Sequence, residues 1–130
     1  MLLTELAAGF LRVGATDRAA VAVEDARLMM EHTGQRGCEP EIHRVGALIL
    51  AAEGGSDANV AEEFLSAIEI ALDAGSLLLA LRAARDVANC AAVAADPELA
   101  LSVGRAIDAA PLRLADELRA AFEGVLSASE

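Results

Sequence analysis

The sequence predicts an all-α fold, for three reasons. Apolar residues recur at spacings of three and four along most of the 130-residue chain. Glycine and proline stand where such stretches end and begin, as they do at helix termini. No stretch alternates β-branched with polar residues as a strand would. Hydrophobic residues make up 55% of the chain without any tryptophan or tyrosine, so we expect a single domain over residues 1–130, with a core of closely packed alanine, leucine and valine.

Residues 39 to 75 predict two helices joined by a short turn. Pro40 fits the first turn of a helix, where its missing N–H needs no partner. Gly54 and Gly55 fit the end of that helix, and Asn59 with Glu62 predicts a capping box for the next one. The expected apolar faces consist of Ile42, Val45, Ile49 and Ala52 in the first helix, and of Val60, Phe64, Ala67, Ile68 and Ala71 in the second, which ends at Gly75.

Similar signals predict further helices on both sides of this stretch. They are a first short helix ending at Gly14, a second from about 17 to 33, a fifth from Ser76 to about Ala94, a sixth beginning at Asp96-Pro97-Glu98 and a seventh beginning at Pro111. Thr16 or Asp17 is the expected N-cap of the second helix. Helices this short are stable only when an apolar face packs on a neighbour, so we expect one packed array.

A pattern of large and small residues recurs with a period of about 40 residues. In the second helix of each expected hairpin it reads Ala19, Val23, Ala26, then Val60, Phe64, Ala67, then Leu99, Val103, Ala106. In the first helices it reads Leu3, Leu6, Ala7, Phe10, then Ile42, Val45, Gly46, Ile49, then Ala84, Val87, Ala88, Ala91. The pattern resembles the tetratricopeptide repeat. That resemblance implies a right-handed α-solenoid of about three antiparallel helix hairpins plus a C-terminal capping helix.

A second resemblance rests on the order Glu39-x-Glu41-Ile42-x-Arg44-Val45-x-x-x-Leu48, a turn with Asp57, Ala67-Ile68-Glu69-Ile70-Ala71, Gly75 and Leu81-Arg82-Ala83-Ala84. This order is similar to the C-terminal repeat region of large bacterial signalling ATPases, which also carry a cyclase or DNA-binding domain. It departs from that pattern in the first hairpin and in the alanine-rich fifth helix. The resemblance implies a scaffold or sensor surface belonging to a bacterial transcriptional or cyclase regulator.

The composition restricts the kinds of ligand. The formal net charge is −11, whereas a nucleic-acid backbone requires a basic surface, so we expect no direct nucleic-acid binding. The chain has no lysine, which removes Schiff-base chemistry. Cys38 and Cys90 lack paired spacing and predict reduced thiols in a cytoplasmic protein. The longest apolar runs are too short to span a bilayer, so no membrane contact is expected.

An enzyme is the alternative from another class. Four residues with metal-binding side chains lie close together in the sequence: His32, Cys38, Glu39 and His43. Their spacing matches no established zinc motif, and flexible glycines intervene. The sequence therefore predicts no catalytic residue, no metal and no cofactor. A small metal-dependent hydrolase that uses the two histidines is the least favoured interpretation.

A group of polar residues predicts a partner-binding groove. In tetratricopeptide domains the first helices of the hairpins line a concave surface, and the resemblance places on or beside that surface Arg12, His43, Arg44, Arg82, Arg85 and Asn89. Guanidinium groups bind carboxylates and peptide backbones through forked donors, so the expected ligand is an acidic or C-terminal peptide. The alternative is that these arginines form ordinary pairs within their own helices, for example Arg82 with Asp86.

The predicted function is a non-catalytic protein-interaction or scaffold module. Homodimerisation is the main alternative, through apolar residues of the first or last helix: Leu2, Leu3, Leu112 or Leu118. A sensor that binds a small apolar ligand between hairpins is a third interpretation. A concentration-dependent mass would separate the homodimer from a peptide-binding monomer.

Overall fold

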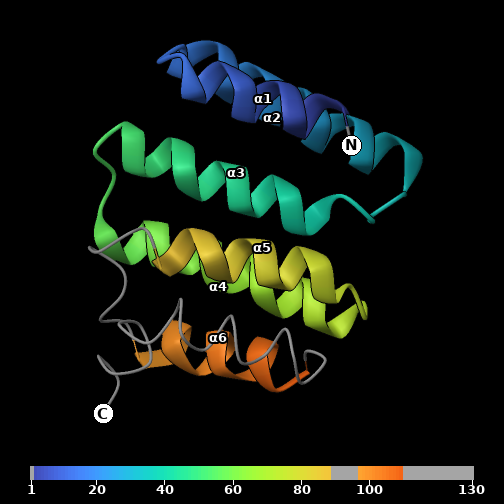
Figure 1. The fold of residues 1–130 in the computed structure, drawn as a ribbon. Helices are drawn as coiled ribbons and strands as arrows, with labels where there is room; N and C mark the ends of the chain where they lie inside the picture. Colours follow the sequence, from blue (N-terminus) through green and yellow to red (C-terminus); the bar gives the residue numbers. More distant parts are fainter. Residues whose placement is uncertain (1, 89–96, 110–130) are drawn as a thin grey trace.

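The computed structural model describes residues 2–88 and 97–109, and every regular element in these two ranges is a helix. The helices are α1 (Leu2–Arg12), α2 (Thr16–Thr33), α3 (Glu39–Ala52), α4 (Asp57–Asp73), α5 (Leu77–Ala88) and α6 (Pro97–Ala109). Figure 1 shows them stacked side by side, with α1 and α2 at one end and α6 at the other. The predicted all-α class is confirmed for this part of the chain.

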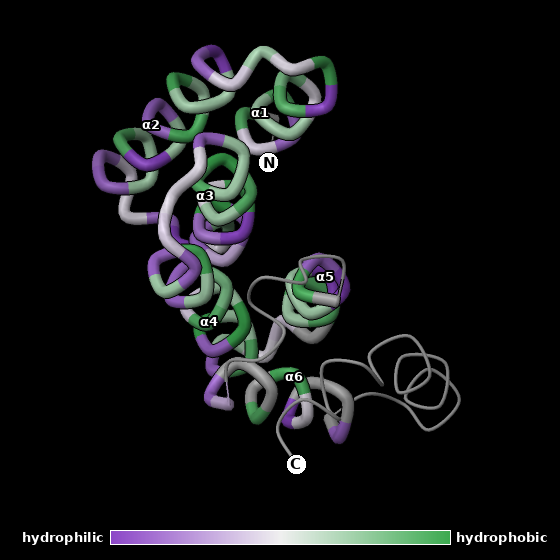
Figure 2. Tube along the Cα trace, turned by 90° about the vertical axis from the view of Figure 1, so that its left-hand side faces the viewer, coloured by the Kyte–Doolittle hydropathy of each residue, from purple (hydrophilic) through white to green (hydrophobic). Residues whose placement is uncertain are grey.

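Helix α3 lies at the centre of the array. It contacts α1 and α2 on one side of the stack and α4 and α5 on the other. Each helix also contacts its neighbour in sequence, and α6 contacts both α4 and α5. In the turned view of Figure 2, α1 and α5 lie on the same side of the row formed by α2 and α4. Side chains of α3 therefore contact every other described helix except α6.

Two clusters of buried residues form the core. One joins α1, α2 and α3, and is built largely from alanine, with Ile42, Val45 and Met30 as its larger members. The other joins α3, α4, α5 and α6 around Phe64 and Ile68, which are fully buried. The predicted small-residue positions of the second helices are confirmed as buried at Ala19, Val23, Ala26, Val60, Phe64, Ala67 and Val103. Alanine at these positions lets neighbouring helices approach closely.

The turn between α3 and α4 ends one helix with glycine and begins the next with serine. Gly54 has a φ of 77°, in the left-handed region that favours glycine. The predicted capping box at Asn59 and Glu62 is wrong. Helix α4 begins at Asp57 with Ser56 as its N-cap, three residues before the expected cap, and the Oγ atom of Ser56 accepts the N–H of Asn59 at 3.2 Å. Serine is as good an N-cap as asparagine, so the sequence offered two caps three residues apart.

Other local predictions also need correction. The N-cap of α2 is Ala15, without a side-chain hydrogen bond, and both Thr16 and Asp17 lie inside the first turn. Asp17 still stabilises that turn through its charge. Two residues expected on apolar faces are exposed: Ala52, in the last turn of α3, and Leu6 on α1. Helix ends extend beyond the core, and α1 has no described helix on its outer side.

Several predictions fall outside the described residues. They concern Asn89, Cys90, the end of the fifth helix near Ala94, the cap at Asp96 and the seventh helix from Pro111 with Leu112 and Leu118. The side chains of Leu99 and Ala106 in α6 are likewise not described.

Candidate functional site

A buried group of charged residues joins α3 to α5. The Nη2 atom of Arg44 lies 2.8 Å from Oε2 of Glu41, one turn earlier on α3, and its Nε atom donates to both oxygens of the same carboxylate. Its Nη1 atom donates to Oδ2 of Asp86 on α5 at 2.7 Å. Only 11% of the Arg44 side chain and 7% of the Glu41 side chain are exposed. Arg44 is thus held by two carboxylates from two helices.

Arg82 completes this group, which we call the Arg44 cluster: Glu41, Arg44, Arg82 and Asp86. Its Nη1 atom lies 3.4 Å from Oε2 of Glu41, so Glu41 receives a guanidinium from each helix. The Arg82 side chain is 45% exposed, far more than that of Arg44. Two arginines and two carboxylates carry no net formal charge together. Of the two guanidinium groups, only that of Arg82 is open to solvent to a large extent.

The pKa of Arg44 shows that its two carboxylate partners offset the cost of burying its charge. Burial opposes the charged form, but the hydrogen bonds from Arg44 to Glu41 and Asp86, together with the charges of both carboxylates, raise the pKa of the guanidinium above its ordinary value. Arg44 is therefore charged throughout the working pH range. A buried charge of this kind must keep its partners, because an unpaired ion in the interior is strongly destabilising. The cluster fixes α5 to α3 in one position.

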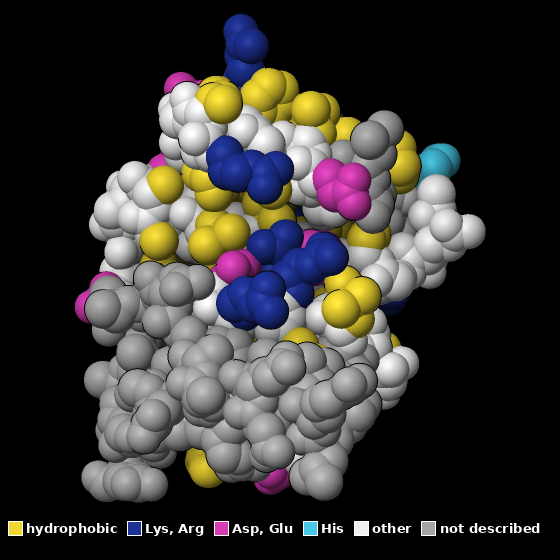
Figure 3. All heavy atoms as spheres, viewed as in Figure 1, with side chains coloured by type: hydrophobic (Ala, Val, Ile, Leu, Met, Phe, Trp, Pro, Cys, Tyr) yellow, Lys and Arg dark blue, Asp and Glu magenta, His cyan; other side chains and the backbone are white. Residues whose placement is uncertain are grey.

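A polar pocket of about 360 Å³ lies beside the Arg44 cluster. Three helices that are distant in sequence contribute to it, and its lining consists of Thr4, Glu5, Gly37, Cys38, Glu41, Leu79 and Arg82. We call it the α1–α3–α5 pocket. On the face shown in Figure 3, basic side chains (dark blue, all arginine in this chain) gather with acidic ones at mid-height, below an area of apolar side chains. The pocket thus joins a half-exposed arginine to two acidic side chains, Glu5 and Glu41, and to small polar and apolar groups.

The structure brings together only some of the residues expected in a groove. Arg44 and Arg82 meet at Glu41, but Arg44 is occupied by its two carboxylates. Arg85 is exposed on α5, one turn after Arg82, and Arg12 is exposed in the last turn of α1. The alternative pairing of Arg82 with Asp86 within α5 is not observed, because Asp86 accepts from Arg44.

His43 makes its contact with α4 instead. Its Nδ1 atom lies 2.9 Å from Oε2 of Glu63, and both side chains are partly exposed. The hydrogen bond to His43 lowers the pKa of Glu63, burial opposes this, and the charges of His43 and Arg27 act in the same direction as the hydrogen bond. Glu63 also lines a pocket with residues of α2, including Arg27. His43 and Arg44 are neighbours in sequence but pair with different helices.

The sequence did not reveal that Glu41 and Asp86 belong to one cluster, since Asp86 was expected to pair with Arg82 within its own helix. Glu41 lies in the first turn of α3, where it also interacts favourably with the helix dipole. Its position three residues before Arg44 was the available signal for a pair within the helix. Asp86 follows Arg85 and lies four residues after Arg82 on α5, so the sequence favoured a pair within that helix. The pairing of α3 with α5 could not be read from either signal alone.

The suspected metal ligands do not form a site within the described residues. No group of three or more histidine, cysteine, aspartate or glutamate side chains in that part of the chain is arranged to hold a metal ion. Glu39 accepts from Arg36 at 2.6 Å, His43 pairs with Glu63, and His32 is exposed at the end of α2.

Comparisons with known proteins do not assign a family. The chain matches no model of a protein family, no curated protein and no solved structure. The resemblance to tetratricopeptide repeats therefore stays a prediction. Among residues 2–88 and 97–109, no helix is both long and apolar enough to cross a membrane.

Proposed function

We propose that the chain is a protein-interaction module with a tetratricopeptide-like, right-handed arrangement of three helix hairpins and a C-terminal capping helix. Two features support this arrangement. Helices α1 and α2, α3 and α4, and α5 and α6 contact each other pairwise, and α1, α3 and α5 contact in succession. The alanine residues of the 40-residue pattern are buried where their side chains are described.

The ligand that we propose is a segment of a partner protein that carries a carboxylate, either its C-terminus or an acidic side chain. The observation that supports this proposal is the position of Arg82 at the α1–α3–α5 pocket. Its guanidinium has five N–H donors, and its ion pair to Glu41 is long, at 3.4 Å. A carboxylate binds guanidinium groups in a forked geometry, so Arg82 serves as the anchor of the ligand.

Arg44 has a different role in this proposal. Its short contacts to Glu41 and Asp86 and its burial leave it no access to a ligand. It holds α3 and α5 at the separation that shapes the pocket. The carboxylate of Glu41 in turn orients the guanidinium of Arg82 through their ion pair. The cluster thus provides one guanidinium for recognition and one for structure.

A non-catalytic role fits this use of the charged residues. Glu41 and Asp86 both accept from Arg44, which leaves neither carboxylate available as a general base. The sequence resemblance supports a place within a bacterial signalling or transcriptional regulator of the cytoplasm. We therefore propose a scaffold or sensor surface of such a regulator rather than an enzyme.

A selection from a peptide library tests the proposal. The chain is immobilised and presented with randomised peptides that have free carboxyl termini, and the selected peptides are then synthesised as free acids and as amides. We expect binding to the free acid to weaken at least tenfold, or about 1.4 kcal/mol, in the double variant Arg82→Ala/Arg85→Ala.

The matched control is Arg27→Ala/Arg105→Ala, which removes two exposed arginines from α2 and α6 and lowers the net charge equally. It is expected to bind as the wild type does. Equal binding by all three chains, or equal losses in both double variants, would contradict a carboxylate site at Arg82.

A further inference from the structure

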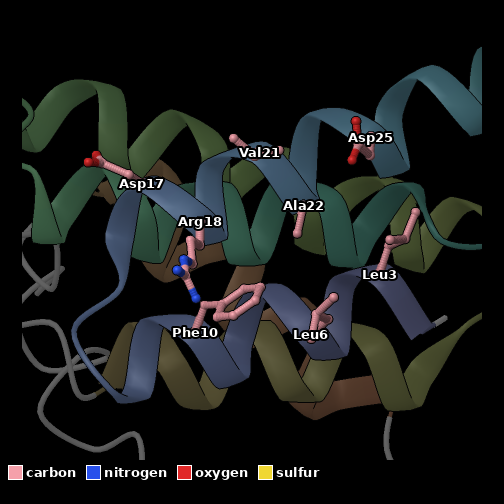
Figure 4. A pocket seen from close by; sticks show the side chains of 8 residues that line it. All are labelled: Leu3, Leu6, Phe10, Asp17, Arg18, Val21, Ala22 and Asp25. Atoms are coloured by element: carbon pink, nitrogen blue, oxygen red, sulfur yellow. The ribbon is translucent and has the colours of Figure 1, made fainter.

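The outer side of α1 and α2 carries an apolar groove that the Arg44 cluster does not use. It encloses about 370 Å³ and is lined by Leu3, Leu6, Phe10, Asp17, Arg18, Val21, Ala22 and Asp25. Within the described chain, α1 and α2 contact only each other and α3. Figure 4 shows Leu6, Phe10, Arg18 and Ala22 between the two helices, and Asp17, Val21 and Asp25 along α2, with Arg18 towards one end of the groove and Asp25 towards the other.

The residues around this groove are unusually apolar for a free surface. Leu6 is 47% exposed and Val21 is 62% exposed, and Leu28 on the following turns of α2 is 54% exposed. Arg18, Val21, Asp25 and Leu28 follow each other at spacings of three and four, so they form a single stripe along α2. The stripe alternates charged and apolar residues, and exposed apolar side chains next to polar ones are typical of an interface when they gather in one place. This stripe and the groove beside it we call the α1–α2 face.

We propose that the α1–α2 face binds a second copy of this chain, with the two α2 helices packed antiparallel about a two-fold axis between Val21 and Ala22. In that register a residue at position i faces position 43 − i of the other copy. Arg18 of each copy then lies opposite Asp25 of the other, and Val21 lies opposite Ala22. The face is self-complementary, as a two-fold interface requires.

The charges select this arrangement over a parallel one. In a parallel pair the two Arg18 side chains would face each other, as would the two Asp25 side chains, and like charges at an interface are repulsive. In the antiparallel pair the same residues form two reciprocal ion pairs. The third charged residue of the lining, Asp17, lies in the first turn of α2, where the helix dipole stabilises it. Reciprocal pairing also limits the repulsion between two chains with a net charge of −11 each.

The size of the α1–α2 face determines how tightly we expect the two copies to bind. Helix α2 has 18 residues, so it is about 27 Å long. Two helices of this length side by side offer an area near the lower limit for a stable protein–protein interface. We therefore expect a dimer that dissociates on dilution. This inference is independent of the α1–α3–α5 pocket, which shares no lining residue with the groove.

The test is sedimentation of the full 130-residue chain over a range of concentrations, with charge-reversal variants at the two paired positions. Arg18 and Asp25 are seven residues apart on one helix, about 10 Å along its axis, so they do not pair within one copy. We expect Arg18→Asp alone and Asp25→Arg alone each to weaken the dimer at least tenfold. An equimolar mixture of these two variants should form a heterodimer, because both ion pairs are then restored between the copies.

Two further variants replace exposed apolar residues by aspartate. Val21→Asp should abolish the dimer, while Leu101→Asp, at a similarly exposed position of α6, should leave it unchanged. Circular dichroism of every variant verifies that the helices are retained. A wild-type chain that stays monomeric, a dimer that survives Arg18→Asp, or a mixture that stays monomeric would each overturn the proposal.

Discussion

Two neighbouring residues of α3 make charged contacts of very different kinds. Arg44 is almost buried and pairs with Glu41 and Asp86, whereas His43 is partly exposed and pairs with Glu63. The first contact joins α3 to α5 and the second joins α3 to α4. A buried ion that loses its partner is strongly destabilising, while an exposed pair is weakened by water and salt. Burial, and not the length of the hydrogen bond, therefore determines how much each pair stabilises the fold.

The largest effect is expected from Glu41→Gln. The amide oxygen of glutamine can still accept from Arg44, but the negative charge that Arg44 and Arg82 share is lost, so Asp86 alone compensates the buried guanidinium of Arg44. We expect the free energy of unfolding to fall by about 3 kcal/mol, as for other broken buried pairs. Urea denaturation followed by circular dichroism measures it.

The matched control for this substitution is Glu39→Gln, two residues away. Glu39 pairs with Arg36, whose side chain is 60% exposed, so we expect a loss below about 0.5 kcal/mol. If both variants lost the same stability, burial would not be the property that separates these pairs.

A smaller effect is expected from Asp86→Asn. The amide oxygen can still accept from Arg44, but the charge that compensates the guanidinium is gone. We expect a loss of about 1–2 kcal/mol, in the range of hydrogen bonds to charged groups. The same denaturation experiment measures it, and an unchanged midpoint would show that Asp86 does not hold α5 to α3.

The smallest effect is expected from Glu63→Gln, on the other side of α3. We expect a loss below about 1 kcal/mol at neutral pH, which should shrink further as salt is added. The pKa of Glu63 is lowered from 4.5 in the folded chain. Its contribution is therefore present above that value and is lost as the pH falls through the lowered folded pKa.

Denaturation of the wild type and of Glu63→Gln across pH 3 to 7 measures this dependence. The difference between the two chains should close towards acid pH. If the difference in the free energy of unfolding widened in acid, the protonated carboxyl group of Glu63 would stabilise the fold more than the carboxylate does.

The sequence predicted the helices well and the contacts between them poorly. Glycine and proline at the helix ends are local signals, so the turn at Gly54 and the first turn at Pro40 were found. Burial at Phe64 and Ala67 followed from the helical period. Capping was harder, because Ser56 and Asn59 are both good N-caps and packing of the helix selects between them.

The candidate site depends on contacts between helices, which no local pattern contains. Arg44 and Asp86 are 42 residues apart, and their pairing is set by the rotation of α3 against α5. His43 was expected at the groove together with Arg44. It pairs with Glu63 of α4 instead, because adjacent residues of a helix point in different directions. Arg82 and Arg44 were both expected on or beside the groove, but Glu41, which pairs with both, was not singled out.

The most direct test compares the two sides of α3 in binding. A peptide selected for its free carboxyl terminus is titrated against the wild type, Arg82→Ala and His43→Ala, with the affinity measured by calorimetry. The proposed function predicts at least a tenfold weaker affinity for Arg82→Ala and an unchanged affinity for His43→Ala, because only Arg82 lies at the α1–α3–α5 pocket. A loss in His43→Ala as large as that in Arg82→Ala would contradict the account and move the binding site to the α4 side of α3.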